Sequence, residues 1–376
     1  MPTTNNRNAY LKNINRLVIK LGSNILTTDQ GLNVAIIRQL AMQVHQLIEK
    51  GKQISIVSSG AMAAGMRKLS LKSRPTEIPL KQAIAAIGQA GLIQEYEKAF
   101  EFFDHKVAQI LLTRTDLSNR TRYLNARNTI RALLAWNVTP IINENDTVAV
   151  EEIKFGDNDH LSAMIALMLN ADLLINLTDI EGVFDKDPRT NHDAELIQMV
   201  SSFTRELENC ASGIPGTLGT GGMLTKIKAA QKVTTAGIPM VITRASMDVL
   251  NQILDGQNVG TFFIPKNQKM KNRKCWIAFS KKTRGRIQLD EGANHAIKNK
   301  GKSLLPIGVI GVQGKFTIGD AIAIETQSGQ EIGTGLTNYS SEDIQLIMRK
   351  KSHEIEQILG EKPYDEIIHR DNMVIT

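Results

Sequence analysis

The segment "RLVIKLGS", residues 16–23, is almost wholly aliphatic until it ends in small or polar residues. Segments of the same kind recur further along the chain: "QISIVSSG" (53–60), "VAQILLT" (107–113), "VTPIINEND" (138–146), "ADLLINLTD" (171–179) and "PMVITRA" (239–245). Continuous Val, Ile and Leu runs of this length are typical of strands buried on both faces. The segments between them have helical length and spacing: 33–50, 80–103, 123–137, 159–170 and 224–236. The alternation predicts an α/β fold, a three-layer sandwich with a mainly parallel central sheet.

The ends of these strands carry residues that suit a ligand site. Small or polar residues close most of them: Lys20, Gly22 and Ser23; Ser58, Ser59 and Gly60; Asn143, Asn145 and Asp146; Thr178 and Asp179. In open α/β sheets, ligands bind at the carboxyl ends of the strands. We therefore expect these groups to converge on one crevice.

The segment "GTLGTGGMLTKIKAA", residues 216–230, is rich in glycine and then becomes helix-like. Lys226 stands four residues beyond Gly222, so the spacing is not that of a Walker loop. Glycines let backbone amides approach an anion, and the start of a helix adds a positive pole. The segment therefore suits a phosphate, although a flexible loop with a surface lysine fits the local sequence equally well.

Two lysines suit phosphoryl transfer, which depends on neutralising charge on the phosphate oxygens. Lys20 would point from the end of its strand into the crevice, and Lys226 would face it from the other side. Asp159, at the start of an expected helix, would orient both lysines. The simpler interpretations are that Lys20 leaves the core for solvent and that Asp159 only caps its helix.

Further polar residues point to the substrates. Asn158 and Asp146 suit an amino acid, with Asp146 accepting from an α-ammonium group. Thr178 and Asp179 suit a nucleotide. Residues of these types are also common in turns, so the sequence leaves both interpretations open.

The composition is that of a soluble protein. The length of 376 residues is long for a single hydrophobic core and predicts two domains. Cys210 and Cys275 make no disulfide framework, which favours a reducing compartment. The polar start is unlike a signal peptide, and no run reaches the roughly 18 apolar residues of a membrane span. We therefore expect a cytoplasmic protein. The net charge of +7 favours anionic partners but does not by itself indicate nucleic acid.

The composition and the hydrophobic pattern of the chain change after about residue 265. Residues 266–286 hold nine Lys or Arg and no Asp or Glu. Short segments separated by turn residues follow, which predicts a small all-β domain, and residues 340–360 predict a terminal helix. We therefore expect an N-terminal extension, a catalytic domain, a basic linker and a C-terminal domain that includes the closing helix: 1–15, 16–265, 266–284 and 285–376.

The order of the motifs carries a family resemblance. The chain holds "VIKLGS", "IVSSGAMAAG", "IINEND", "GDND", "LTDIEGVFDKDPR" and "GTGGMLTKIKAA" in sequence. In this order they resemble the amino-acid kinase superfamily, and most closely the glutamate 5-kinases, over residues 16–265. The remainder resembles a PUA domain through "DEGANHAIKNKGKSLLPIGVIGV", "FTIGDAIAI" and "GQEIGTGL".

The resemblance implies ATP-dependent phosphorylation of the γ-carboxylate of L-glutamate, which gives L-glutamyl 5-phosphate and ADP in the first step of proline biosynthesis. It implies that Lys20, Lys226 and Asp159 are catalytic and that Ser59, Asp146 and Asn158 bind glutamate. The implied ATP-binding residues are Lys20, Thr178, Asp179, Thr220, Gly221, Gly222, Met223, Leu224, Thr225 and Lys226. Magnesium is expected on phosphate oxygens and water, with no protein ligand. The acceptor carboxylate is already ionised, so no general base is needed.

The resemblance also implies partners: a second copy in a homodimer or homotetramer, proline as a feedback inhibitor, and RNA through the PUA-like domain. A glutamate-5-semialdehyde dehydrogenase would take the labile acyl phosphate. Two features depart from the family pattern. Residues 1–15 lie outside it, and Asn176 puts an amide into a strand that is usually aliphatic there.

Two rival interpretations remain. The first is another kinase of the superfamily, acting on acetylglutamate, aspartate or uridylate; "SSGAMAAG" beside "INEND" and "GDND", and the PUA-like tail, argue against it. The second is an RNA-binding or RNA-modifying protein with a kinase-like scaffold, which the basic linker suggests. Retention of both lysines and Asp159 favours a working enzyme.

Overall fold

The structure is a computed structural model that describes residues 7–28, 31–149, 158–212, 222–266, 269–270, 272–279 and 283–375. The chain divides into two compact units, Met1–Lys269 and Met270–Thr376. No helix among these described residues is long and apolar enough to cross a bilayer. Cys210 and Cys275 are both free thiols.

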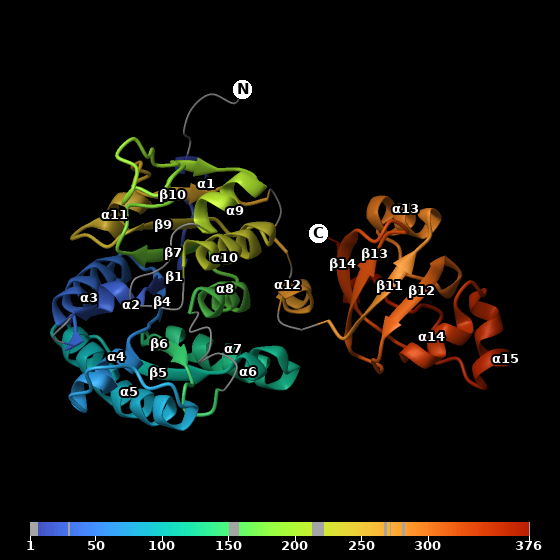
Figure 1. The fold of residues 1–376 in the computed structure, drawn as a ribbon, viewed down its shortest axis with the longest axis horizontal. Helices are drawn as coiled ribbons and strands as arrows, with labels where there is room; N and C mark the ends of the chain where they lie inside the picture. The colour runs from blue at the N-terminus through green and yellow to red at the C-terminus, as the bar shows by residue number, and fades with distance from the viewer. Residues whose placement is uncertain are drawn as a thin grey trace. The chain divides into compact units, whose positions relative to one another are not determined.

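The first unit is built on a sheet in the order β5-β6-β4-β1-β7-β9-β10-β8 (Figure 1). Its strands are β1 (Arg16–Leu21), β4 (Gln53–Val57), β5 (Val107–Leu112), β6 (Thr139–Glu144), β7 (Leu173–Thr178), β8 (Met199–Val200), β9 (Met240–Arg244) and β10 (Thr261–Phe263). All neighbouring pairs are parallel except β9 and β10. The six strands expected from apolar runs and the mainly parallel sheet are confirmed.

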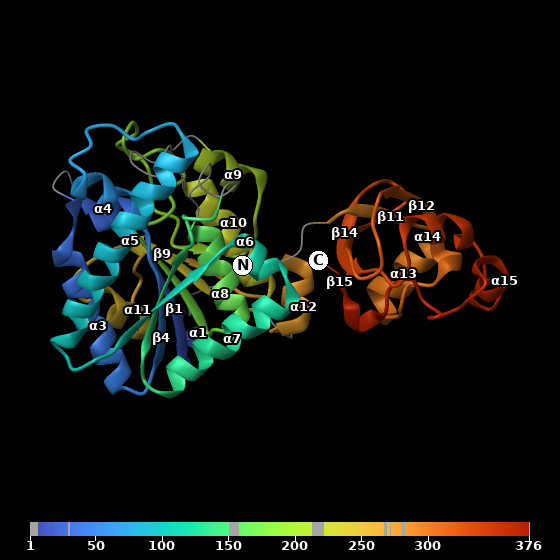
Figure 2. The ribbon, with the colours of Figure 1, turned by 90° about the horizontal axis from the view of Figure 1, so that it is seen from below.

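Helices cover both faces of this sheet, as Figure 2 shows from below. On one face, α3 (Val34–Glu49), α5 (Ile78–Glu101) and α11 (Val249–Leu254) form a core with alternate residues of the strands, including Leu17, Ile19 and Leu21 of β1. The other face carries α7 (Arg120–Ala135), α8 (Asn158–Leu169) and α10 (Met223–Thr235). Because side chains alternate along a strand, Val18 and Lys20 lie on this second face. The five helices expected from the sequence are confirmed.

Shorter elements that the sequence analysis did not predict complete the first unit. They are α1 (Arg7–Leu11), α2 (Ser23–Leu26), β2 (Thr27–Thr28), β3 (Gly31–Leu32), α4 (Ala61–Lys68), α6 (Arg114–Ser118) and α9 (Arg205–Ser212). Arg7 in α1 is buried, and its guanidinium donates to the carbonyl oxygens of Gln198 and Val259 at 2.6 and 2.7 Å. It also lies over the ring of Phe262, 5.7 Å from the ring centroid. Helix α1 is therefore attached to the β8–β10 end of the sheet.

The second unit holds a five-stranded sheet in the order β12-β11-β13-β14-β15. These strands are β11 (Gly285–Leu289), β12 (Val309–Gly314), β13 (Ala321–Glu325), β14 (Glu331–Leu336) and β15 (Met373–Ile375). The small β-sheet domain is confirmed, but it is not all-β, because α13 (Glu291–Lys300) lies between its first two strands. In the segment expected as a basic linker, α12 (Asn272–Phe279) buries Cys275, Trp276 and Ile277.

The prediction of a single terminal helix over residues 340–360 is wrong. The structure has α14 (Ser341–Ile347), a 3-10 turn at Ser352–Glu354 and α15 (Ile355–Leu359). The helix stops at Met348, whose ψ of 141° is outside the helical region, and Arg349 follows in a left-handed conformation with φ of 64°. The chain then continues into β15, which pairs with β14 and closes that edge of the sheet.

Candidate active site

The carboxyl ends of four neighbouring strands, β6, β4, β1 and β7, meet the first turn of α8. Lys20 lies near the end of β1, and its strand neighbour on β7 is Asn176. Two consecutive residues of α8, Asn158 and Asp159, reach into this region, and both are buried. Asn158 contacts the β4 and β6 side, and Asp159 contacts the β1 and β7 side.

Asp159 joins the two lysines that the sequence singled out. Its Oδ1 accepts from Lys20 Nζ at 2.5 Å, and its Oδ2 accepts from Lys226 Nζ at 3.1 Å. Asp159 is fully buried, and the two lysine side chains are only 5% and 8% exposed. Asp159 is therefore more than a helix cap, because it holds an ammonium group on each oxygen. We call Lys20, Asp159 and Lys226, with the neutral donors Asn176 and Thr225, the charged cluster.

The electrostatics of Asp159 follow from two opposing effects. Burial alone would raise the pKa of its carboxyl group, because a charge is costly away from water. The positive charges of Lys20 and Lys226 outweigh that effect and hold the pKa of Asp159 well below its usual range. The carboxylate is therefore ionised at any pH at which the protein works.

The same carboxylate has two neutral donors. Asn176 donates from Nδ2 to Oδ1 at 2.8 Å, and Thr225 Oγ1 lies 2.7 Å from Oδ2. The Thr225 hydroxyl is also 2.7 Å from the carbonyl oxygen of Gly222, so it shares its one proton between them. Each oxygen of Asp159 thus has one lysine and one neutral partner. Asn176, noted in the sequence only as unusual, is part of the cluster.

Asn158 joins the ends of β4 and β6 through hydrogen bonds between uncharged groups. Its Nδ2 lies 2.6 Å from the carbonyl oxygen of Ser58, 3.0 Å from Ser59 Oγ and 2.9 Å from Asn143 Oδ1. The turn after Ser59 requires Gly60, whose φ of 101° is one that glycine adopts without strain. We call Asn158, Ser58, Ser59 and Asn143 the neutral cluster.

Comparisons with known proteins identify the family of this chain. The model described as "Amino acid kinase family" matches residues 15–244, and the "PUA domain" model matches residues 285–359. The glutamate 5-kinase of Caldanaerobacter subterraneus subsp. tengcongensis is 50% identical, covering 96% of this chain and 97% of that protein. That of Geobacter sulfurreducens is 49% identical, covering 98% of this chain and all of that protein. The chain belongs to the glutamate 5-kinase family.

Membership of the glutamate 5-kinase family confirms the resemblance drawn from the motifs. A solved structure of carbamate kinase from Giardia lamblia bound to AMP-PNP is 18% identical, with a TM-score of 0.49. It aligns with 67% of this chain and 99% of that one.

Two residues behind the neutral cluster were missed by sequence reasoning. Gln89 accepts from Asn143 Nδ2 at 2.8 Å, and Tyr96 shares a 3.0 Å hydrogen bond with Ser58 Oγ. Both come from α5, which approaches α4 so closely that a Cβ on Gly88 would lie 1.8 Å from the carbonyl oxygen of Ala61. Burial raises the pKa of the Tyr96 hydroxyl, which therefore stays neutral.

The structure describes some, but not all, of the residues expected to bind ATP. Thr178 ends β7 and donates to Asp179 Oδ1 at 2.9 Å, and Asn24 donates to Asp179 Oδ2 at 3.1 Å. Burial raises the pKa of Asp179, but these two hydrogen bonds, a backbone hydrogen bond and the positive charge of Lys226 together outweigh burial and hold the pKa below its usual range. Both carboxylate oxygens of Asp179 therefore accept a hydrogen bond beside the carboxyl end of β7.

The glycine-rich segment is described only from Gly222, which precedes the first residue of α10; Thr220 and Gly221 lie outside the described residues. Met223 is buried and Leu224 is half-buried at the start of α10. Asp146 lies half-buried in the turn after β6. None of the described residues forms a group of three acidic, His or Cys side chains fit for a metal.

Proposed function

We propose that this chain phosphorylates the γ-carboxylate of L-glutamate with ATP, which gives L-glutamyl 5-phosphate, the first intermediate of proline biosynthesis. The observation that carries the proposal is the charged cluster at the strand ends, in a chain of the glutamate 5-kinase family. Two buried ammonium groups on one carboxylate suit a reaction in which negative charge moves between oxygens.

The lysines would do the electrostatic work. Lys20 and Lys226 approach Asp159 from β1 and α10, so their ammonium groups face each other across its carboxylate. Each ammonium group carries three N–H donors, so a lysine that contacts Asp159 can also reach other acceptors. The two ammonium groups would contact the phosphate oxygens of ATP, and their positive charges would favour the charge distribution of the transition state. The neutral donors Asn176 and Thr225 would keep Asp159 from turning as the lysines engage phosphate.

Gly22 supports the proposed path for phosphate. A Cβ on this residue would lie 4.0 Å from Lys20 Nζ and 3.5 Å from the carbonyl oxygen of Leu177, both ordinary contacts. The packing of the protein does not itself require glycine there. A small residue beside the lysine would instead leave room for phosphate oxygens against the backbone.

The neutral cluster would hold glutamate. The amide nitrogen of Asn158 is committed to protein acceptors, so we assign its carbonyl oxygen Oδ1 to a donor on the substrate. Ser59, at the same strand end, would donate its hydroxyl proton to a substrate carboxylate, and Asp146 would accept from the α-ammonium group. The γ-carboxylate is ionised at neutral pH and needs no base to act as nucleophile.

Magnesium would assist by neutralising phosphate charge. Both oxygens of Asp159 are already occupied by donors, so this carboxylate does not suit direct coordination. Phosphate oxygens and water would therefore supply the ligands, as is usual for a cation that gives up water reluctantly.

The proposal is tested by glutamate-dependent formation of ADP, with hydroxylamine present to trap the acyl phosphate as a hydroxamate. We expect both products with L-glutamate and neither with aspartate, acetylglutamate or uridylate. Hydroxamate or ADP formed with one of those acceptors, and not with glutamate, would move the activity to another kinase of the superfamily. The assignment of roles to single residues is tested separately by the variants described in the Discussion.

A further inference from the structure

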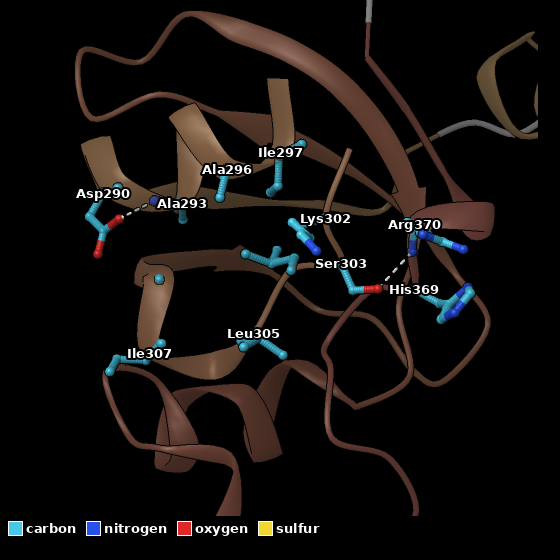
Figure 3. Close-up of a pocket in the computed structure, with 13 residues that line it drawn as sticks. Asp290, Ala293, Ala296, Ile297, Lys302, Ser303, Leu305, Ile307, His369 and Arg370 are labelled. Atoms are coloured by element: carbon cyan, nitrogen blue, oxygen red, sulfur yellow. Dashed lines mark hydrogen bonds between the residues drawn. The ribbon is translucent and has the colours of Figure 1, made fainter. Parts of the chain in front are cut away.

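The C-terminal unit contains a cavity of about 730 Å³ that plays no part in the proposed phosphoryl transfer. Three segments line it: α13 as far as Ile297, the loop that precedes β12, and the residues at the start of a 3-10 turn near the C-terminus (Figure 3). Its volume falls in the range of small-molecule sites, about 300–1,000 Å³. The cavity lies wholly within one compact unit, so its walls are fixed by the fold of that unit.

The floor of the cavity is apolar. Ala293, Ala296 and Ile297 of α13 face Leu305 and Ile307 of the loop across the hollow (Figure 3). Leu305 is 42% exposed and Ile307 is 48% exposed, so both present apolar surface to solvent. An apolar ligand body would remove this surface from water, and that transfer is favourable.

One end of the cavity is basic. The lining at this end includes Lys302, His369 and Arg370, and the backbone N–H of Arg370 donates to Ser303 Oγ at 3.0 Å, which joins the two segments. Asp371 Oδ2 lies 3.7 Å from His369 Nδ1, so Lys302 and Arg370 are the two basic residues without that acidic neighbour. The acidic residue of the lining, Asp290, lies at the opposite end (Figure 3). Its Oδ1 accepts from the N–H of Ala293 at 2.6 Å and caps α13. An anionic group would therefore meet the basic end rather than the acidic one.

We propose that this cavity binds a small amphipathic anion, a carboxylate or phosphate ester attached to an apolar body. The apolar floor would take the body, while Lys302 and Arg370 would pair with the charged group. The lining contains no Phe, Tyr or Trp, the side chains on which proteins usually stack the bases of single strands. Its cations also sit at one end rather than along a groove that could follow a phosphate backbone. The cavity thus suits a compact ligand better than a nucleic-acid strand.

The proposal is tested on the full-length chain with octanoate as the probe and octan-1-ol as the neutral match of equal chain length. Binding is followed through the methyl NMR signals of Ile297 and Ile307 in ¹³C-methyl-labelled protein. We expect octanoate to shift both signals saturably and to bind about tenfold more tightly than the alcohol, because a charge-assisted contact is added. Equal affinity for the two probes, or no shift of these signals, would overturn the proposal.

Variants locate the anionic contact. Lys302→Glu and Arg370→Glu together should weaken octanoate binding about tenfold or more and leave octan-1-ol binding within about twofold. Lys315→Glu changes the same charge at an exposed residue outside the lining, and it should leave both probes unaffected. Loss of octanoate binding in Lys315→Glu to the same extent would refute the site. The comparison of the two probes on the unaltered chain decides the matter even if a variant does not fold.

A short single-stranded oligoribonucleotide and a free mononucleotide complete the set of probes. If the oligonucleotide shifts the Ile307 signal at concentrations at which octanoate and the mononucleotide do not, the cavity is part of a nucleic-acid surface and the proposal fails. Competition of octanoate with the mononucleotide for the same methyl signals would support it, since both carry one anionic end on a compact body.

Discussion

Asn158 and Asp159 are neighbours in the chain, yet the two clusters they organise differ in kind. The charged cluster around Asp159 is ionic, with two ammonium groups on one carboxylate. The neutral cluster around Asn158 consists of amides, hydroxyls and a backbone carbonyl. Phosphoryl transfer needs charge that can be shared with a moving group, whereas recognition of a small acceptor needs fixed hydrogen-bond geometry. One turn of α8 would thus set the distance between the two functions.

The largest effect is expected from Lys226→Ala in the charged cluster. This change removes a charge contact to the transition state, so kcat should fall about a hundredfold or more. The KM for glutamate should change little, because the neutral cluster is untouched. Lys228→Ala, two residues along α10 and exposed, is the matched control and should keep wild-type kcat. An ADP-release assay with circular dichroism as a check on folding measures both; a wild-type kcat in Lys226→Ala would remove this lysine from the mechanism.

The next effect falls on the glutamate side. Asp146→Ala should raise the KM for glutamate about tenfold or more, because a hydrogen bond to a charged group is lost. The KM for ATP should stay within about twofold of wild type. Initial rates measured while each substrate is varied in turn separate the two constants. A parallel rise in the KM for ATP would show that Asp146 belongs to the nucleotide side instead.

Much of this arrangement could be predicted from the sequence, because strand ends in a parallel sheet must share an edge. Lys20 and Ser59 each follow an aliphatic run, so the sheet alone brings them to one side. Asp159 and Lys226 begin helices that pack on that sheet, and the structure brings both to Lys20. Their proximity was therefore predictable, while their roles remain predictions.

Other parts depend on tertiary contacts that leave no local pattern. Gln89 and Tyr96 lie within a long helix whose sequence shows no sign that they face the strand ends. Arg7 sits in a polar segment and is buried only because distant carbonyl groups accept its N–H groups. The short strand β15 is too brief to show an apolar run, and its pairing with β14 forms it.

His160, the third residue of α8, makes the free energy of unfolding depend on pH. Burial lowers the pKa of His160 to about 3, and the nearby charges of Lys232 and Arg114 lower it as well. Lys232 Nζ lies 2.6 Å from its Nδ1, so the neutral ring accepts and links α8 to α10. The unfolded chain binds a proton at this histidine below about pH 6.5, and the folded chain does not until about pH 3.

The free energy of unfolding should therefore fall as the pH drops below about 6.5, by up to about 1.4 kcal/mol per pH unit from this one group. His160→Gln should remove that part of the slope. Urea unfolding at pH 7, 6 and 5 measures it in both proteins. Equal slopes would show that His160 is protonated in the folded protein over this range, contrary to its burial beside Lys232.

A smaller effect is expected from Asn176→Leu, which makes this position of β7 aliphatic. The change removes one donor from Asp159, but it also removes the Asn176 Oδ1 atom, which is buried with no partner among the described residues. These two effects oppose each other, so the free energy of unfolding should stay within about 1 kcal/mol of wild type. We expect kcat to fall only a few-fold, because Lys20 and Lys226 still hold the carboxylate. A loss as large as that of Lys226→Ala would make Asn176 essential to the charged cluster.

The smallest effect is expected from removal of the C-terminal unit. Both clusters lie before Lys269, so a shortened chain should keep its parallel-sheet core and its glutamate kinase activity. An end near Pro265 would remove the contacts that Lys266 and Lys269 make with the first unit. The Lys266 N–H donates to the carbonyl oxygen of Thr234 at 2.9 Å, and Lys269 Nζ pairs with Asp172 at 2.6 Å and donates to the carbonyl oxygen of Ala171 at 3.3 Å. Asp172 also accepts from the N–H of Arg16 at the start of β1, so the pair supports the strand that carries Lys20.

A chain that ends after Met270 keeps these contacts, and its kcat and both KM values should stay within about twofold of wild type. The chain that ends after Pro265 should be less stable, by up to about 1 kcal/mol for the exposed ion pair and about as much for the backbone hydrogen bond. Thermal unfolding and initial rates of the two truncations measure this. If the chain ending after Met270 were folded but inactive, the first unit would not be a self-sufficient kinase, and the C-terminal unit would have a part in catalysis that neither cluster explains.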